Sequence, residues 1–386
     1  MAAPEHVRAA LTARTRGGPP LCAYVYDTAA LRRRATQVRA AFPPGTTMLY
    51  AVKANGHPDV VRALAGVCDG LEVASGGELR LALAAGARRV VFGGPGKTDA
   101  ELAAARQAGA LLNVESEHEL RRVAADRAPA GQPVAIRVNR AAAAPVGSHA
   151  MTGTPTPFGV DEAHLPDLLE LAGRLGVPVA GFHLHAVSNS LDAAGYARFV
   201  TDALAWSRSV AARHGVDLRL VNVGGGLGVD YRGAATIDLA DLGRRLHGAA
   251  LPGVELIVEP GRVLAADAGW YAAQVLDLKT THGRTFAVLR GGTHHFRLPA
   301  AWGYSHPFSV LPVDRWPYPW PRPQVAATTV DAVGELCTPR DVLARDVPVA
   351  RLRLGDVLIF GRAGAYGWDI SHHDFLRHDP PEFIVL

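Results

Sequence analysis

Short apolar segments alternate with helical segments along most of the chain, and no other feature of the sequence restricts the fold as strongly. Each apolar segment is four to six residues long and rich in β-branched side chains, as buried strands usually are. Eight such strands are predicted, at Met48 to Lys53, Gly70 to Ala74, Val90 to Gly93, Leu111 to Glu115, Val134 to Asn139, Gly181 to Ala186, Leu218 to Val223 and Glu255 to Glu259. Helices are predicted between or before them, including Thr28 to Ala40, Pro58 to Ala65, Glu78 to Ala85, Asp99 to Ala108, Glu117 to Ala125 and Gly195 to Arg213. Because parallel strands need long crossover connections, this alternation indicates a parallel sheet.

Eight strand and helix repeats within roughly 220 residues have the size of a closed (β/α)8 barrel. We therefore predict this α/β fold, a TIM barrel, for residues 28–267. An open, doubly wound sheet is the alternative, because the same alternation of strands and helices also produces it.

The pattern changes after about Ala268, where strand-like segments follow one another with few helical ones. These segments are Trp270 to Leu276, Thr285 to Leu289, Val325 to Val330, Asp356 to Phe360 and Phe383 to Leu386. They predict a C-terminal β-rich domain, a β-barrel or sandwich, over residues 268–386. Cys22 to Tyr26 has the same pattern, so residues 1–27 are predicted to contribute to that domain. The Pro- and Trp-rich residues 311–323 predict a loop.

Charge and cysteine content exclude several classes of protein. The 386 residues include 40 Lys and Arg against 36 Asp and Glu, and Arg32 to Arg34 form the only dense basic run, so we expect no nucleic-acid partner. Cys22, Cys68 and Cys337 are odd in number and widely spaced, which fits neither a disulfide framework nor a metal site. No apolar stretch approaches the about 18 residues that suggest a membrane span, and the N-terminus lacks a signal pattern. We therefore predict a cytoplasmic protein without metal or membrane association.

The side chains that end the barrel strands form the candidate functional site, because active sites of such barrels lie at the carboxyl ends of the strands. Lys53 ends the first strand, Arg137 lies in the fifth, and His185 and Ser188 follow the sixth. A lysine at the dry end of a strand is a candidate Schiff-base former. On position alone, a solvated loop lysine is the more common explanation.

A run of three glycines, Gly224 to Gly226, follows the seventh strand, and Gly261 follows the eighth. Glycine lets backbone amides approach an anion closely, and phosphate sites are frequent at this place in a barrel, although a lone glycine triplet is more often a turn. Combined with Lys53 and the strand-end carboxylate Glu259, the run indicates pyridoxal 5'-phosphate. The lysine would bond the cofactor, the glycines would bind its phosphate, and the carboxylate would face the pyridine nitrogen. His185 either stacks on the ring or fills the core.

Two segments of the β-rich region carry further candidates. Cys337 lies among turn residues and charges, which is unusual for a buried structural cysteine, so its thiol is a candidate proton donor to a carbanion. Tyr366 offers a phenol from a glycine-flanked loop, or it is a packing residue.

Six motifs occur in the order found in the fold-type III pyridoxal-phosphate decarboxylases, the group that contains diaminopimelate, ornithine and arginine decarboxylases. They are Tyr50-Ala51-Val52-Lys53-Ala54-Asn55, Ser75-Gly76-Gly77-Glu78-Leu79, Asn113-Val114-Glu115-Ser116, Gly224-Gly225-Gly226-Leu227-Gly228, Glu259-Pro260-Gly261-Arg262 and Gly364-Ala365-Tyr366. Nearly the whole chain resembles this family.

The resemblance implies a role for each matched position. Lys53 would form the Schiff base, His185 would stack on the ring, and Glu259 would face the pyridine nitrogen. The phosphate would be held by Ser188, Gly224, Gly225, Gly226, Gly261 and Tyr366, and Arg137 would also line the cofactor site. Family members are homodimers with shared active sites, so Cys337 and Asp341 would act beside the partner's Lys53. Substrate contacts are predicted at Arg262, Arg297, Thr338 and Asp341.

The predicted substrate follows from departures from the family pattern. Thr338 follows Cys337, where diaminopimelate decarboxylases usually have an acidic residue that recognises the distal amino group. The family's Lys-Phe-Gly segment is Pro157-Phe158-Gly159 here. The runs His185 to Asp192 and Ile370 to Leu376 resemble the siderophore-pathway branch, which decarboxylates citryl-diamino acid conjugates. We predict such a substrate, with diaminopimelate or another basic amino acid as the alternative.

Two other classes of function share this fold and cofactor. An amino-acid racemase is disfavoured by Glu259 and Cys337, because a carboxylate at the pyridine nitrogen favours loss of carbon dioxide. A non-catalytic cofactor-binding protein is disfavoured by the β-rich region with its cysteine.

Overall fold

The computed structural model describes residues 3–126, 131–142, 144–233 and 235–386. The chain divides into two compact units. The barrel unit comprises Leu31–Asp230 and Ala235–Leu264, and the β unit comprises Met1–Ala30, Tyr231–Ala234 and Ala265–Leu386.

Eight parallel strands form the barrel unit. They are β2 (Thr47–Ala51), β3 (Gly70–Val73), β4 (Val90–Phe92), β5 (Leu111–Val114), β6 (Val134–Asn139), β9 (Val179–His183), β11 (Leu220–Asn222) and β12 (Glu255–Val258). Each pairs with the next in this order, and β12 pairs back to β2, which closes the sheet. The predicted barrel is confirmed, and the open doubly wound sheet is wrong.

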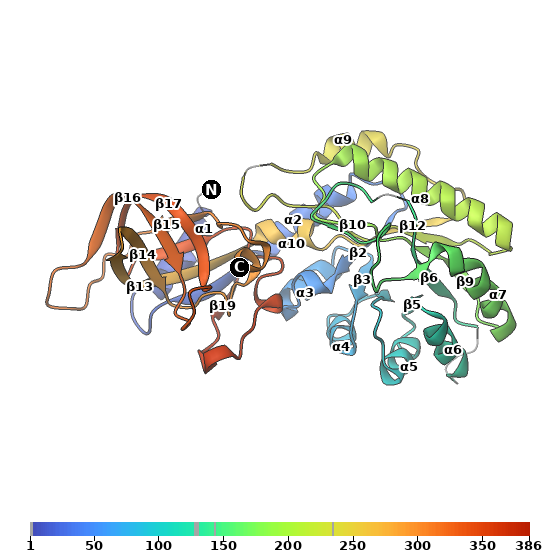
Figure 1. The fold of residues 1–386 in the computed structure, drawn as a ribbon, viewed down its shortest axis with the longest axis horizontal. Coiled ribbons are helices and arrows are strands. Elements are labelled where there is room, and N and C mark those ends of the chain that lie inside the picture. The colour runs from blue at the N-terminus through green and yellow to red at the C-terminus, as the bar shows by residue number, and fades with distance from the viewer. Residues whose placement is uncertain (1–2, 127–130, 143, 234) are drawn as a thin grey trace. The chain divides into compact units, whose positions relative to one another are not determined.

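The helices of the barrel unit follow its strands, and Figure 1 shows α3 to α7 in succession along the outside of the sheet. They are α2 (Thr28–Arg39), which begins in the β unit, α3 (Pro58–Ala65), α4 (Gly76–Ala84), α5 (Asp99–Gln107), α6 (Glu117–Ala125), α7 (Leu165–Leu175), α8 (Ala193–His214), α9 (Leu239–Arg245) and α10 (Arg262–Ala265), which ends in the β unit. Ser75, Thr98 and Ser116 cap α4, α5 and α6 by accepting backbone N–H bonds, so the strand-to-helix turns are sharply defined. Buried apolar side chains of the strands, including Leu49, Val91 and Ile257, pack together in one cluster.

Three strands of two residues each were not predicted from the sequence. β7 (His149–Ala150) pairs antiparallel with β10 (Val187–Ser188), and β8 (Val160–Asp161) extends the sheet beside β6. Two-residue strands contain too few positions to show an alternating pattern. Lys53, predicted to be the last residue of a strand, lies instead in the 3₁₀ turn η1 (Val52–Ala54) after β2.

The described residues of the β unit form one eight-stranded sheet and the short helices α1 (Glu5–Arg14) and α11 (Leu298–Trp302). Its strands are β1 (Cys22–Tyr26), β13 (Gly269–Thr281), β14 (Arg284–Leu289), β15 (Phe308–Leu311), β16 (Gln324–Val333), β17 (Val342–Arg353), β18 (Val357–Phe360) and β19 (Glu382–Val385). β1 pairs antiparallel with β13 and parallel with β19. Val7 and Leu11 of α1 pack with Val25 and Ile384 in its core.

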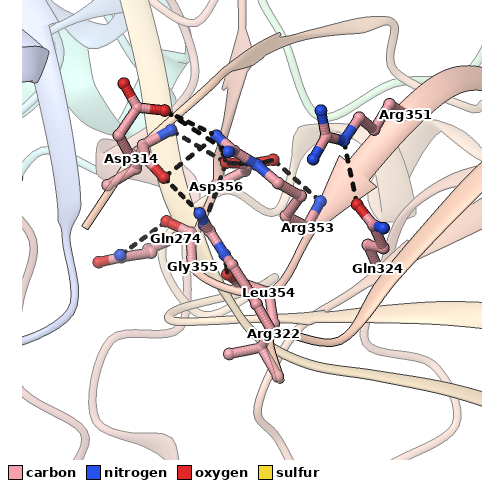
Figure 2. A network of polar contacts seen from close by, with 10 residues as sticks. Gln274, Asp314, Arg322, Gln324, Arg351, Arg353, Leu354, Gly355 and Asp356 are labelled. Atoms are coloured by element: carbon pink, nitrogen blue, oxygen red, sulfur yellow. Dashed lines mark hydrogen bonds and ion pairs between the residues drawn. The ribbon is translucent and has the colours of Figure 1, made fainter. Parts of the chain in front are cut away.

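A buried carboxylate fixes the turn before β18 (Figure 2). Asp356 is 2% exposed and accepts bonds from Nη2 of Arg322 at 3.2 Å, from Nη2 of Arg353 at 3.0 Å and from the backbone N–H of Val313 at 2.9 Å. Arg322 also donates to the backbone oxygens of Val313 and Leu354. These bonds hold the predicted Pro- and Trp-rich loop, which contains no strand between residues 312 and 323, against the sheet.

Candidate active site

Lys53 lies at the carboxyl ends of the barrel strands, and its amine is held by a carboxylate from the neighbouring strand. Nζ of Lys53 donates to Oε2 of Glu72 at 2.9 Å. The side chain of Glu72 is 5% exposed, whereas that of Lys53 is 44% exposed. The amine is therefore oriented by a buried anion while one side of the lysine stays accessible to a small molecule.

Glu259 follows β12 and is 4% exposed. Its Oε1 accepts from Nδ2 of Asn222 at 2.6 Å, and its Oε2 lies 3.4 Å from Nε2 of His183. Burial alone would raise the pKa of this carboxyl, but His183, Lys53 and Asn222 outweigh burial and lower the pKa of Glu259 to about 2. The group is consequently an anion at neutral pH, as a partner for a protonated pyridine nitrogen must be.

His185 presents a neutral imidazole ring. The backbone N–H of Gly225 donates to its Nδ1 at 3.1 Å, which leaves the ring proton on Nε2. Burial, followed by the positive charges of Arg137 and Lys53, lowers the pKa of His185 well below its ordinary value. An uncharged, flat ring is suited to stacking on an aromatic cofactor.

The glycine run packs closely against its neighbours. A Cβ at Gly224, whose φ is +69°, would lie 2.4 Å from Nδ1 of His185, and one at Gly225 would lie 2.6 Å from the backbone oxygen of Glu259. The amides of Gly224 and Gly225 already donate to Asn222 and His185. Within the described contacts, the amides of Gly226 and Gly261 have no acceptor, so these two are the ones available to a phosphate.

Arg137 is buried beneath the strand ends and is paired within the protein. Its Nη1 donates to Oε1 of Glu115 at 3.1 Å, and its guanidinium lies 4.6 Å above the ring of Phe158. Glu115 also accepts from the amides of Gly94 and Gly159, so the ion pair ties three strand-end loops together. Ser188 lies in β10 and is half-buried, and Arg262 is 7% exposed at the start of α10.

The remaining predicted residues belong to the β unit. Cys337 is exposed, and Tyr366 is half-buried with a φ of +53°. Arg297 and Thr338 line one cavity of this unit. Asp341 is 2% exposed, and its carboxylate accepts from the backbone N–H groups of Thr293 at 2.6 Å and Leu336 at 2.9 Å. Asp341 thus holds the backbone beside Cys337 in place. The contact of Asp341 with substrate stays a prediction.

Sequence reasoning assigned no role to Glu72, His183 or Asn222, which contact the predicted site residues directly. Each is a polar side chain at or near the end of an otherwise apolar barrel strand. A polar residue at the carboxyl end of a barrel strand is typical of the active-site face, so these three residues could have been predicted from the sequence.

The side chains of the barrel site fit pyridoxal phosphate. Lys53 supplies an amine, Glu259 an anion, His185 a neutral ring, and Gly226 and Gly261 two uncommitted amides. Nδ1 of His183 and the side-chain amide of Asn113 are buried without a described hydrogen-bond partner, as expected of a site that encloses a polar ligand.

Comparisons with known proteins agree with this fit. The family model of the pyridoxal-dependent decarboxylases, pyridoxal binding domain, matches residues 28–266. The chain is 38% identical to a 2-[(L-alanin-3-ylcarbamoyl)methyl]-2-hydroxybutanedioate decarboxylase of Staphylococcus aureus, over 95% of this chain and 94% of that protein. It is 36% identical to a diaminopimelate decarboxylase of Deinococcus radiodurans, over 96% and 90%. The crystal structure of diaminopimelate decarboxylase from Helicobacter pylori with L-lysine matches with a TM-score of 0.84 at 27% identity, over 98% and 94%.

These matches confirm the predicted family, cofactor and type of reaction. Within the described residues, no helix has the length and apolar character needed to cross a membrane. The chain belongs to the fold-type III pyridoxal-phosphate-dependent decarboxylases, and it is a carboxy-lyase.

Proposed function

We propose that this enzyme decarboxylates the amino-acid end of a conjugate in which citrate is joined by an amide to a diamino acid. The observation that carries the proposal is the composition of the cavity lined by Thr338. None of its described lining residues is acidic. A free distal ammonium group would find no counter-ion there, whereas an acylated nitrogen needs none.

The similarity to the Staphylococcus aureus protein supports the same substrate class. The substrate in that relative's name is an amide of this kind, and both chains are matched almost completely. Diaminopimelate, the substrate named for other relatives, has a charged amino group at its far end and is the competing candidate.

Pyridoxal phosphate, when bound, supplies an electron sink for the pair of electrons left when carbon dioxide departs. The residues of the barrel unit keep this sink effective. Glu259 would keep the pyridine nitrogen protonated, His185 would cover one ring face, and the amides of Gly226 and Gly261 would hold the phosphate. Lys53 would attach the cofactor through Nζ, with Glu72 as its counter-ion.

The thiol of Cys337 would donate the proton that replaces the lost carboxyl group on Cα. We infer that it does so in the site of a partner subunit, so that the working enzyme is a homodimer. The exposure of Cys337 in its own chain supports this arrangement. Cytoplasmic localisation stays a prediction.

Carbon dioxide release from a panel of L-amino acids tests the substrate. We expect the citryl conjugate of L-2,3-diaminopropionate to react with a kcat/KM at least about tenfold above that of diaminopimelate, ornithine, lysine or arginine. A preference for a free diamino acid would refute the proposed substrate.

Mixing Lys53→Ala with Cys337→Ala protein tests the shared site. In a mixed dimer with shared sites, one of the two sites combines the intact Lys53 of one chain with the intact Cys337 of the other. Random exchange makes about half of the dimers mixed, so about one quarter of the wild-type activity is restored. Recovery in the mixture, with two nearly inactive parents, is the expected result. A mixture no more active than its parents would place Cys337 and Lys53 of one chain in the same site.

A further inference from the structure

A cavity of about 640 Å³ lies in the β unit beside Thr338. Three arginines, Arg297, Arg340 and Arg345, line it, together with His372 and the hydroxyl-bearing side chains of Thr338, Tyr304 and Ser305. Arg340 and Arg345 have no assigned part in the cofactor site or in the reaction. We propose that these two arginines bind the carboxylates at the far end of the substrate, a proposal that rests on the decarboxylation proposed above.

The backbones that carry the two arginines are held in place. Oγ of Ser305 accepts from the backbone N–H of Arg345 at 2.8 Å and donates to its carbonyl oxygen at 3.1 Å. The N–H of Arg340 donates to Oγ1 of Thr338 at 3.3 Å, and the next residue is the buried Asp341. Both guanidinium groups therefore project from fixed points of attachment, which reduces the entropy lost when they bind an anion.

Within the described contacts, the arginines of this cavity are not paired with acidic side chains. None of the described lining residues is Asp or Glu, and no ion pair is found for Arg297, Arg340 or Arg345. Other arginines of the β unit do have such partners. Arg284 pairs with Asp331, Arg290 with Glu335, Arg353 with Asp356 and Arg362 with Asp267. Uncompensated guanidinium groups around one cavity favour a ligand with more than one carboxylate.

The place of the cavity in the chain connects it with the reaction. Thr338 lines the cavity, and the preceding residue is Cys337, the proposed proton donor to Cα. A substrate whose reacting carbon lies beside the thiol would extend its far end past Thr338. In a citryl amide that end bears two carboxylates and a hydroxyl, which match two arginines and the neighbouring hydroxyl groups.

The test compares Arg340→Ala, Arg345→Ala and the double variant with wild-type holoenzyme. The substrates are the citryl conjugate of L-2,3-diaminopropionate and its N3-acetyl analogue, which keeps the amide but lacks the distal carboxylates. We expect each substitution to raise KM for the citryl conjugate about 10- to 100-fold, as loss of a charge-assisted hydrogen bond does, with kcat nearly unchanged. Because it lacks the distal carboxylates, the N3-acetyl analogue should react poorly with the wild type, and the substitutions should leave its rate unchanged.

Arg351→Ala is the matched control. Arg351 is an exposed arginine of β17, the strand that contains Arg345, and its Nε donates to Gln324 (Figure 2). This variant loses one positive charge from the same unit and should keep the wild-type KM. If Arg351→Ala raised KM as much as the cavity variants do, the loss of any positive charge from the β unit would explain the effect, and the proposal would be overturned.

Calorimetric binding of citrate to the holoenzyme separates this proposal from the proposed function. We expect citrate to bind the wild type and Arg351→Ala alike, and the cavity variants at least about tenfold more weakly. Equal citrate affinity and equal KM in all variants would refute the carboxylate site while leaving the decarboxylase intact. If the wild type releases no carbon dioxide from the citryl conjugate, the proposed function fails, and citrate binding still decides the cavity.

Discussion

The charged groups of the barrel site and those of the β-unit cavity differ in how they are compensated. In the barrel, Lys53 is paired with Glu72, and Arg137 with Glu115. In the cavity, Arg340 and Arg345 have no acidic partner among the described residues. A site whose charges are paired in advance is organised for one constant ligand, the cofactor. A site with uncompensated charges obtains its counter-ions from the molecule that it selects.

On the functions proposed above, the cofactor chemistry belongs to the barrel unit, whereas the β unit supplies the proton donor Cys337 and the choice of substrate. Substitutions in the barrel site are therefore expected to reduce turnover of every substrate. Substitutions around the cavity are expected to change which substrate is preferred.

The largest effect is expected at Lys53. Lys53→Ala removes the only proposed attachment point of the cofactor, so activity should fall by about 10³-fold or more, and the visible absorption band of the covalent cofactor should disappear. Lys279→Ala is the control, because Lys279 is a half-exposed lysine of the β unit paired with Asp277. An unchanged absorption band in Lys53→Ala would remove this lysine from the mechanism.

A smaller loss is expected at Glu259, because the cofactor remains bound there. Glu259→Gln keeps the shape but removes the charge that holds the pyridine proton, so kcat should fall about 10²- to 10³-fold for all substrates. Because the pKa of Glu259 is lowered to about 2, the wild-type carboxylate stays ionised from pH 5 to 9, and kcat should show no step from it in that range. Fluorescence titration with the cofactor and steady-state rates check both points. A Gln variant with wild-type kcat would contradict the assigned role.

The β unit is expected to lose stability in mild acid. Burial lowers the pKa of His294 and His306 to about 4 and that of His295 to about 2, against an ordinary value of 6.5. The unfolded chain therefore takes up protons that the folded unit does not, so stability present above pH 6.5 declines as pH falls toward 4.

Urea unfolding followed by tryptophan fluorescence measures this decline, because five of the six tryptophans lie in the β unit. The unfolding midpoint should decrease steadily from pH 7 to 5. His306→Gln should flatten the dependence, whereas His214→Gln, at the exposed end of α8, should not. A midpoint that is constant over this range would show that these histidines are not held neutral by the fold.

Much of the barrel could be predicted because its strands are short, apolar and separated by helices, and each predicted strand lies within a few residues of an observed one. β17 was missed because Arg345, Asp346 and Pro348 interrupt its apolar pattern. It is the last strand in its sheet order, and one of its edges has no neighbour among the described strands, so charges and proline are tolerated there.

The candidate site was predictable to the extent that each residue stood beside a recognisable strand end. Lys53, Glu259 and the glycine run satisfied this condition. Arg340 and Arg345 did not, because in the sequence they look like ordinary surface charges. Only the folded turn and β17 bring their side chains to one cavity.

The choice of substrate is tested most directly by Thr338→Glu, which places a carboxylate beside Cys337. Steady-state kcat/KM is measured for the citryl conjugate and for diaminopimelate, with the cofactor absorption band as a check on the barrel site. If the β unit selects the substrate, kcat/KM for the citryl conjugate falls about tenfold, that for diaminopimelate rises, and the absorption band is unchanged. The same preference in the variant and the wild type, with an intact absorption band, would contradict the assignment of substrate choice to the β unit.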